Sequence, residues 1–216
     1  MNNFTDELSL DNKICILVQG PLNYYKNIIK SYEPYKNNVI ISTNDNSLKA
    51  LFTLYSNDFK IVKTNLAEYP GRCNINNQVK TTFEGVKKAQ EIGFDYIFKI
   101  RSDVFIDDID YLIELLDKKS IYFPAYHNYD GGYLCDFMMF APTKFMLNFW
   151  NLPLTDEDIP PETILTRKYL EINKADTLEY IFPLLYAYKI NAYWAKYDKF
   201  FNYYQNDPTF TYQKQI

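Results

Sequence analysis

Short apolar runs alternate with helical segments between residues 13 and 100, and this rhythm restricts the fold more than any other feature of the chain. Continuous apolar runs are typical of strands that are buried on both faces of a sheet. The runs at 13–18 and 38–42 are of this kind, a third and more exposed strand is predicted at 59–64, and a fourth strand is predicted at 95–100. The intervening helices are predicted over 22–33, 46–55 and 76–92. Strands and helices in this order form right-handed βαβ units, so the sequence predicts an α/β fold with a Rossmann-like, mostly parallel sheet.

The pattern becomes mixed after residue 100. Helices are predicted over 108–118, around 145–150, over 162–172 and over 176–188. Strands are predicted at 121–123, 133–141 and 190–196. The segment 151–161 contains three prolines and is predicted to be a loop. We find neither an internal repeat nor a long linker, so we expect residues 1–216 to form a single domain.

Composition and missing motifs exclude several classes of protein. Aromatic residues make up 18% of the chain, which predicts a packed core rather than disorder. The net charge of -4 offers no general attraction for nucleic acid. A single histidine, His127, cannot build an HExxH or multi-histidine zinc site. Neither GxxxxGK[ST] nor GxGxxG occurs, so Walker-type ATPases and dinucleotide dehydrogenases fit poorly.

The cysteines and the apolar runs bear on the cellular compartment. Cys15, Cys73 and Cys135 form no CxxC pair, so we expect free thiols in a reducing environment. The polar N-terminal stretch differs from a secretory signal, and no run has the length of a transmembrane segment. We therefore expect a cytoplasmic protein, or one at the periphery of an inner membrane. The abundance of Asn, Lys, Ile and Tyr is typical of low-GC bacteria and large DNA viruses, and a viral protein would act in the host cytoplasm.

Polar triplets follow three of the predicted strands. Gln19-Gly20-Pro21 follows the first, Thr43-Asn44-Asp45 the second and Arg101-Ser102-Asp103 the fourth. Ligands of open α/β sheets bind beyond the carboxyl ends of the strands, so we expect the triplets to converge. Arg101 can clamp a phosphate, and Asp103 can hold Mg²⁺ or Mn²⁺ together with substrate phosphates. The alternative is a local Arg101–Asp103 ion pair in an exposed loop.

The start of the helix at 76–92 is a further candidate for ligand binding. Asn77 and Gln78 lie in its first turn, where anions are attracted and amide side chains can bind hydroxyls and bases. The alternative is that Asn74 or Asn76 only caps the helix.

Three more residues are candidates, each with a simpler alternative. Asp136 interrupts the apolar run 133–141, where a carboxylate is costly unless it is paired or faces a cleft. It is our candidate general base, and the alternative is a strand residue that points outward. Glu162 either caps a helix or binds substrate hydroxyls. His127 lies in an aromatic loop, as a surface residue or as a substrate contact.

Six segments occur in the order and with the spacing of a known family. They are ILVQGPL, VIIST, NNQVKTTFEGVKKA, DYIFKIRSDVFI, CDFMMFAP and PPETILTRKYL, between about residues 13 and 172. This set resembles the WavE lipopolysaccharide-synthesis family of glycosyltransferases. The resemblance implies a GT-A fold, with a nucleotide-sugar-binding half at about 13–103 and an acceptor-binding half at about 104–200. It also implies transfer of a sugar from a UDP- or GDP-type donor to a glycan acceptor.

The resemblance assigns residues on the donor side. Gln19, Gly20 and Pro21 would line the nucleotide pocket, and Asn77 and Gln78 match the family's Asn-x-Gln turn. Asn44, which the resemblance also places at the donor, stands where the family often has tryptophan.

The resemblance also assigns the charged residues. Arg101 and Asp103 match an Arg-Ser/Thr-Asp motif in the place of the DxD motif of other GT-A enzymes. Asp136 matches an Asp-aromatic segment, and Glu162 matches a Pro-Glu turn. We therefore expect metal-assisted transfer, with Mn²⁺ or Mg²⁺ at Asp103 and Asp136 as the base. Arg101 alone could instead neutralise the leaving diphosphate. The other interpretations are a sugar nucleotidyltransferase and a non-catalytic sugar-nucleotide-binding module.

Overall fold

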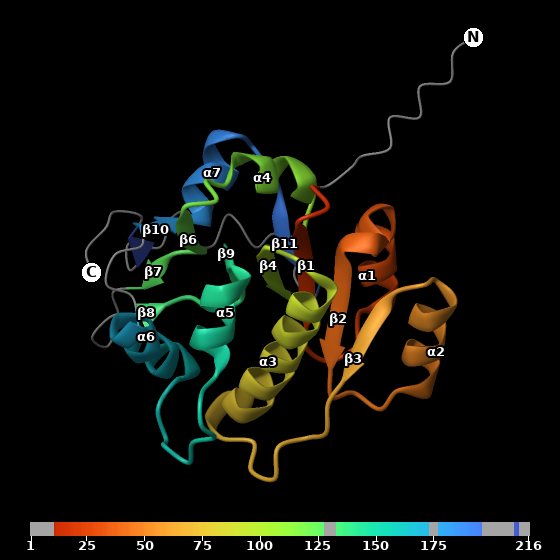
Figure 1. The fold of residues 1–216 in the computed structure, drawn as a ribbon, viewed down its shortest axis with the longest axis horizontal. Helices are drawn as coiled ribbons and strands as arrows, with labels where there is room; N and C mark the ends of the chain where they lie inside the picture. The colour runs from red at the N-terminus through yellow and green to blue at the C-terminus, as the bar shows by residue number, and fades with distance from the viewer. Residues whose placement is uncertain (1–10, 128–132, 173–176, 196–209, 212–216) are drawn as a thin grey trace.

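The computed structural model describes residues 11–127, 133–172, 177–195 and 210–211, and a seven-stranded sheet runs through its centre (Figure 1). The strand order is β10-β6-β9-β4-β1-β2-β3. Four neighbouring strands are all parallel, namely β1 (Ile14–Gln19), β2 (Val39–Thr43), β3 (Lys60–Lys63) and β4 (Tyr96–Arg101). The predicted α/β class with a mostly parallel, Rossmann-like sheet is therefore confirmed.

The rest of the sheet is mixed, as the sequence predicts for the C-terminal part. Strand β9 (Met138–Pro142) runs antiparallel to both β4 and β6 (Ser120–Phe123). Strand β10 (Thr177–Tyr180) is parallel to β6. Because β4 pairs with β9 directly, both parts of the chain contribute to one continuous sheet.

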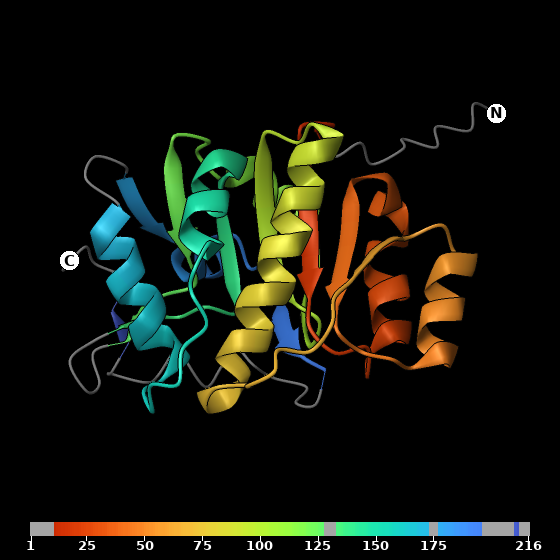
Figure 2. The same ribbon diagram turned by 60° about the horizontal axis from the view of Figure 1, so that its bottom comes forward.

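Helices cover both faces of the sheet, which explains why its strands are apolar on every side. Ile14, Ile16 and Val18 of β1 face one core, and Cys15 and Leu17 face the other. The first core is closed by α1 (Tyr25–Tyr32), α2 (Leu48–Ser56), α4 (Ile109–Leu115) and α7 (Ile181–Ala187). The second is closed by α3 (Ile75–Ile92), α5 (Thr143–Trp150) and α6 (Pro161–Ile172), which lie in front of the sheet in Figure 2.

Helix α3 approaches the sheet unusually closely at Gly85. A Cβ atom there would lie 2.5 Å from Leu17 Cδ1 and 2.9 Å from Ser42 Cβ, so only glycine fits without movement of the sheet. Nearby, Ser42 Oγ donates a hydrogen bond of 2.6 Å to the carbonyl of Thr81. These contacts hold the middle of α3 against β1 and β2.

Several predicted elements in the C-terminal part are wrong in detail. The predicted strand 133–141 is broken into β8 (Tyr133–Leu134) and β9, and the start of the predicted helix 176–188 is strand β10. Three more short strands were not predicted, namely β5 (Val104–Ile106), β7 (Tyr126–His127) and β12 (Phe210–Thr211). They are formed by pairing: β5 pairs with the distant β11 (Ala192–Trp194), and β7 pairs with the nearby β8 and the distant β12. A strand of two or three residues has too few positions to show a period of its own.

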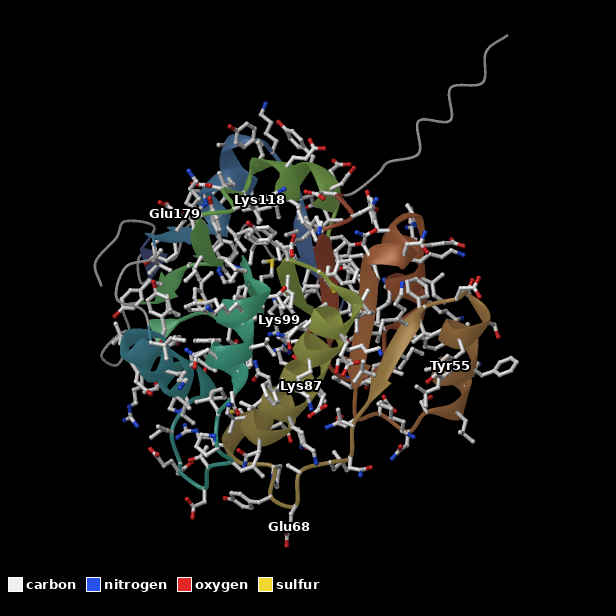
Figure 3. The ribbon with its side chains drawn as sticks, in the orientation of Figure 1. Tyr55, Glu68, Lys87, Lys99, Lys118 and Glu179 are labelled. Carbon is white, nitrogen blue, oxygen red and sulfur yellow. The ribbon has the colours of Figure 1, made fainter. Side chains whose placement is uncertain are left out.

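The helices of the first half begin and end close to their predicted limits. The predicted helix 22–33 is α1, followed by a 3-10 helix at Glu33–Asn38, and another 3-10 turn at Arg72–Asn74 leads into α3. In α2, Leu48, Phe52 and Tyr55 are exposed although their spacing predicts the helix, and Tyr55 points outward in Figure 3. None of the helices in the described residues is both long and apolar enough to cross a membrane.

Candidate functional site

A pocket of about 340 Å³ lies where β1, β2 and β4 end and α3 begins. Every residue predicted for the donor side lines it, from all three converging segments and from the first turn of α3. Its lining residues are Gln19, Gly20, Pro21, Asn44, Leu66, Cys73, Asn74, Asn77, Gln78, Thr81, Arg101, Ser102 and Asp103. The sequence prediction thus located this pocket, while the binding of a nucleotide by these residues remains a prediction.

The floor of the pocket is formed by the close approach of two strand ends. Ser102 donates from its backbone N–H to the carbonyl of Gln19 at 2.8 Å, and from Oγ to the carbonyl of Pro21 at 2.7 Å. Gly20 has φ +135°, and a Cβ atom there would lie 2.5 Å from Ser102 Oγ. Both the backbone angle and the contact therefore require glycine. Ser102, which the sequence analysis did not single out beyond its triplet, joins the two segments.

The amide side chains of the pocket are partly used by the protein itself. Gln19 Nε2 donates to Thr81 Oγ1 at 3.0 Å, and Asn77 Oδ1 accepts from the N–H of Ala67 at 2.8 Å. Gln78 Nε2 donates to a carboxylate oxygen of Asp136. Because these bonds fix the three side chains, their remaining donors and acceptors are held in defined directions.

Helix α3 begins at the pocket without a side-chain cap. Asn74 occupies the cap position with φ 64°, yet its side chain makes no capping hydrogen bond. Asn76 instead bonds with the carbonyl of Tyr69 and with both backbone groups of Thr155, at 2.8–2.9 Å. The alternative that either asparagine caps this helix through its side chain is therefore wrong. An uncapped helix N-terminus carries partial positive charge and favours a nearby anion.

Arg101 and Asp103 form a two-pronged ion pair in the pocket wall. The Nε and Nη2 groups of Arg101 donate to the two carboxylate oxygens of Asp103 at 3.0 and 2.8 Å. The guanidinium also lies over the ring of Trp194, 4.8 Å from its centroid. Burial lowers the pKa of Arg101, but the hydrogen bonds and charge of Asp103 outweigh it, and the pKa is raised overall. The local ion pair considered from the sequence is present, and it lies in the pocket rather than in a separate loop.

The carboxylate of Asp103 does not fit the role of a resident metal ligand. Both of its oxygens already accept hydrogen bonds from Arg101. Among the described residues, no group of three His, Cys, Asp or Glu side chains lies together in a way that could hold a metal ion. A divalent cation at Asp103 would also meet the positive guanidinium directly. The residues present therefore do not suit the predicted Mn²⁺ or Mg²⁺.

Asp136 lies beside this pocket, in the segment between β8 and β9 rather than within a strand. Its side chain is buried, so the alternative of an outward-facing surface residue is wrong. The N–H of Arg101 donates to the carbonyl of Phe137 at 3.0 Å, which keeps this segment next to the end of β4. Gln78 bonds with the Asp136 carboxylate, and Lys99 Nζ donates to its backbone carbonyl at 2.6 Å.

Lys99 is a buried cation that the sequence analysis missed. It lies on β4 in the middle of the molecule (Figure 3), with 0% of its surface exposed and with Nζ 5.3 Å from the ring centroid of Trp150. Burial lowers the pKa of Lys99 to about 8, although the charge of Asp136 opposes this change. The signal was visible, because Lys99 interrupts an apolar strand as Asp136 interrupts its own apolar run.

Glu162 is a second carboxylate of the charged cluster. It lies half-buried in the first turn of α6. Burial raises its pKa, the charge of Asp136 raises it further, and Arg101 acts in the opposite direction. Glu162 is thus within electrostatic range of both residues. The backbone of His127 lies on β7, beside Tyr133 of β8, but its side chain is outside the described residues, so its predicted substrate contact stays a prediction.

Comparisons with known proteins give no family assignment. No family model matches the chain, and no curated protein is significantly similar to it. The fold is similar to that of mannose-1-phosphate geranyltransferase from Thermus thermophilus, with a TM-score of 0.44, 10% identity, and coverage of 76% of this chain and 69% of that one. It is also similar to a glycosyltransferase involved in the glycosylation of the major capsid of PBCV-1, with a TM-score of 0.46, 11% identity, and coverage of 81% and 88%. Both TM-scores are below 0.5, so the function has to be argued from the site itself.

Proposed function

We propose that this protein is a glycosyltransferase that moves a sugar from a nucleotide donor to a hydroxyl of a glycan acceptor. One observation carries the proposal: a pocket with an arginine and several fixed amides lies directly beside a buried, hydrogen-bonded carboxylate. A sugar nucleotide needs a positive group to bind its diphosphate, and amide groups to bind its hydroxyls and its nucleobase. The acceptor hydroxyl needs a general base that removes its proton.

The donor side of the pocket offers groups of the required chemistry. Arg101 carries a permanent positive charge at the end of β4. Asn77 and Gln78 lie in the uncapped first turn of α3, which favours phosphate oxygens. Asn44 lines the pocket from the end of β2. We propose a UDP- or GDP-type donor bound across the ends of the parallel strands, where open α/β sheets bind their ligands.

Asp136 is proposed as the general base for an inverting transfer. Gln78 fixes one carboxylate oxygen, which leaves the other oxygen for the acceptor hydroxyl. As the hydroxyl oxygen attacks the anomeric carbon, its proton passes to Asp136. The bond from that carbon to the diphosphate oxygen breaks, and its electron pair leaves with the nucleoside diphosphate. Arg101 stabilises the negative charge that develops on the leaving group.

The finer assignments rest on the sequence resemblance. We propose membership of the WavE family and a role in polysaccharide synthesis, with a growing glycan as acceptor. We propose a cytoplasmic location on the basis of the three free thiols. Glu162 is proposed to contact acceptor hydroxyls, since it is the second carboxylate near Asp136 and Arg101.

A donor-hydrolysis assay tests the proposal. The purified chain is incubated with a panel of UDP- and GDP-sugars, and release of the nucleoside diphosphate is followed by chromatography. We expect slow release from at least one donor, and loss of that release in Asp136→Asn. A nucleotidyltransferase would instead release pyrophosphate from a nucleoside triphosphate and a sugar 1-phosphate. A binding module would be stabilised by a sugar nucleotide but would turn over neither mixture.

A further inference from the structure

We propose that Arg101 takes the place of a divalent metal in this enzyme, and that the donor diphosphate binds to it without any metal ion. This inference rests on the proposed function and specifies how the same pocket holds its ligand. Three observations support it, namely the geometry of the Arg101–Asp103 pair, the stacking of Arg101 on Trp194, and the neutral character of the remaining wall.

The pairing with Asp103 uses only one edge of the guanidinium. A guanidinium has five N–H groups, and Asp103 accepts from Nε and from one N–H of Nη2. This leaves the edge formed by Nη1 and the second N–H of Nη2. Among the described residues, Asp103 is the one that accepts hydrogen bonds from the side chain of Arg101. The remaining edge has the parallel pair of donors that binds a phosphate with two hydrogen bonds.

Two neighbours hold that edge in a fixed direction. Asp103 sets the rotation of the guanidinium in its plane, and the Trp194 ring at 4.8 Å sets the plane itself. Trp194 is positioned in turn by β11, where the N–H of Ala195 donates to the carbonyl of Asp103 at 2.8 Å. A preorganised arginine loses less conformational entropy when it binds, so it can serve the diphosphate as a metal would.

The guanidinium of Arg101 already occupies the position beside the Asp103 carboxylate that a metal ion would need. Among the described lining residues, Arg101 and Asp103 are the charged ones, and the others are amides, hydroxyls or apolar groups. A divalent cation at Asp103 would have to displace Arg101 or lie within a few ångströms of it, and like charges repel strongly at that distance. A diphosphate at the free edge of Arg101 meets no such obstacle. Asp103 is therefore a positioning residue for Arg101.

Isothermal titration of the full chain with UDP and with GDP tests the inference, once in excess EDTA and once with Mn²⁺. We expect at least one of the two nucleotides to bind, with dissociation constants that agree within about threefold between the two conditions. Arg101→Met should weaken binding about a hundredfold, since it removes two charge-assisted hydrogen bonds of about 1.5 kcal/mol each. Arg101→Lys, which keeps the charge but loses the fork, should weaken it about tenfold and guards against misfolding of the Met variant.

The variant Asp103→Asn distinguishes diphosphate binding by Arg101 from diphosphate binding through a metal ion at Asp103. The amide removes the carboxylate that a metal at this position would use and one of the two acceptors that orient Arg101. Binding should therefore weaken about threefold to tenfold, by the same factor in EDTA and with Mn²⁺. Arg167→Met is the matched control, because Arg167 pairs with Glu157 in an exposed position and should bind nucleotide normally. Binding that appears only with Mn²⁺ and is lost in Asp103→Asn would overturn the inference and leave the proposed function standing. Absence of binding under both conditions would overturn the proposed function and the inference together.

Discussion

The two sides of the pocket are built from different kinds of interaction. The neutral side consists of Gln19, Asn77 and Thr81, which are joined by hydrogen bonds between uncharged groups. The charged side consists of Arg101 and Asp103 in the pocket wall, together with the neighbouring Lys99, Asp136 and Glu162, and all five are partly or fully buried. A lost hydrogen bond between neutral groups typically costs about 1 kcal/mol, whereas a buried charge without its partner costs several. The neutral side should therefore tolerate change far better than the charged side.

Asp136→Asn is expected to have the largest effect. If Asp136 is the base, turnover should fall by about 10²–10⁴ because the amide cannot accept the proton. The dissociation constant of the nucleotide, measured by titration calorimetry, should stay within about threefold, since Asp136 is not among the residues that line the pocket. The fold should remain intact because the asparagine carbonyl can still accept from Gln78. A variant that melts several degrees lower and loses activity only in proportion would show that Asp136 is structural.

Lys99 should make the stability of the wild type depend on alkaline pH. Its pKa in the fold is lowered from 10.5 to about 8, so between these values the unfolded chain binds the extra proton and stability rises with pH. Between pH 7.5 and 10.5, the free energy of unfolding of the wild type should rise by up to about 3 kcal/mol relative to that of Lys99→Met. Urea unfolding at a series of pH values measures this difference. A constant difference across that range would mean that Lys99 stays charged in the fold.

Thr81→Val tests the neutral side. The valine keeps the shape of the side chain but removes the acceptor of the Gln19 amide. We expect a loss of about 1 kcal/mol in the free energy of unfolding, because a neutral hydrogen bond is removed. Nucleotide affinity should change by less than about threefold, as read by titration calorimetry. An affinity loss above tenfold would show that the neutral side is as sensitive as the charged one.

Glu162→Gln should have the smallest effect on stability, and the variant should be more stable than the wild type. Because the pKa of Glu162 is raised in the fold, the folded state binds its proton more tightly, and the wild type loses stability as pH rises through that pKa. The glutamine variant has no such charge, so at pH 7 its melting temperature should be higher by about 1–3 °C. The advantage should vanish below about pH 4, where the carboxyl is protonated in both states. Differential scanning fluorimetry from pH 4 to 8 would show whether the gain instead persists in acid, which would contradict this account.

The first half of the chain could be predicted well from its own residues. Strands β1 and β2 are continuous apolar runs, and Gly20 and Pro34 mark breaks at a strand end or in a connection. The helix α3 shows its period over eighteen residues and was predicted to within one residue at its start. The C-terminal half could not be predicted as well, because β5, β7 and β10 each pair with a strand that is distant in the sequence, namely β11, β12 and β6. In the first half, the buried side of α2 could not be predicted, because apolar residues surround most of this helix.

The sequence by itself determined the α/β order of the chain and the convergence of the three triplets. It could do so because the carboxyl ends of parallel strands necessarily share one edge of a sheet. Only the tertiary structure decided which partner each charge has. Gln78 meets Asp136 across 58 positions of sequence, Lys99 meets it across 37, and Trp194 reaches Arg101 through the pairing of β11 with β5. Such contacts depend on how layers pack in three dimensions, and no local period in the chain records them.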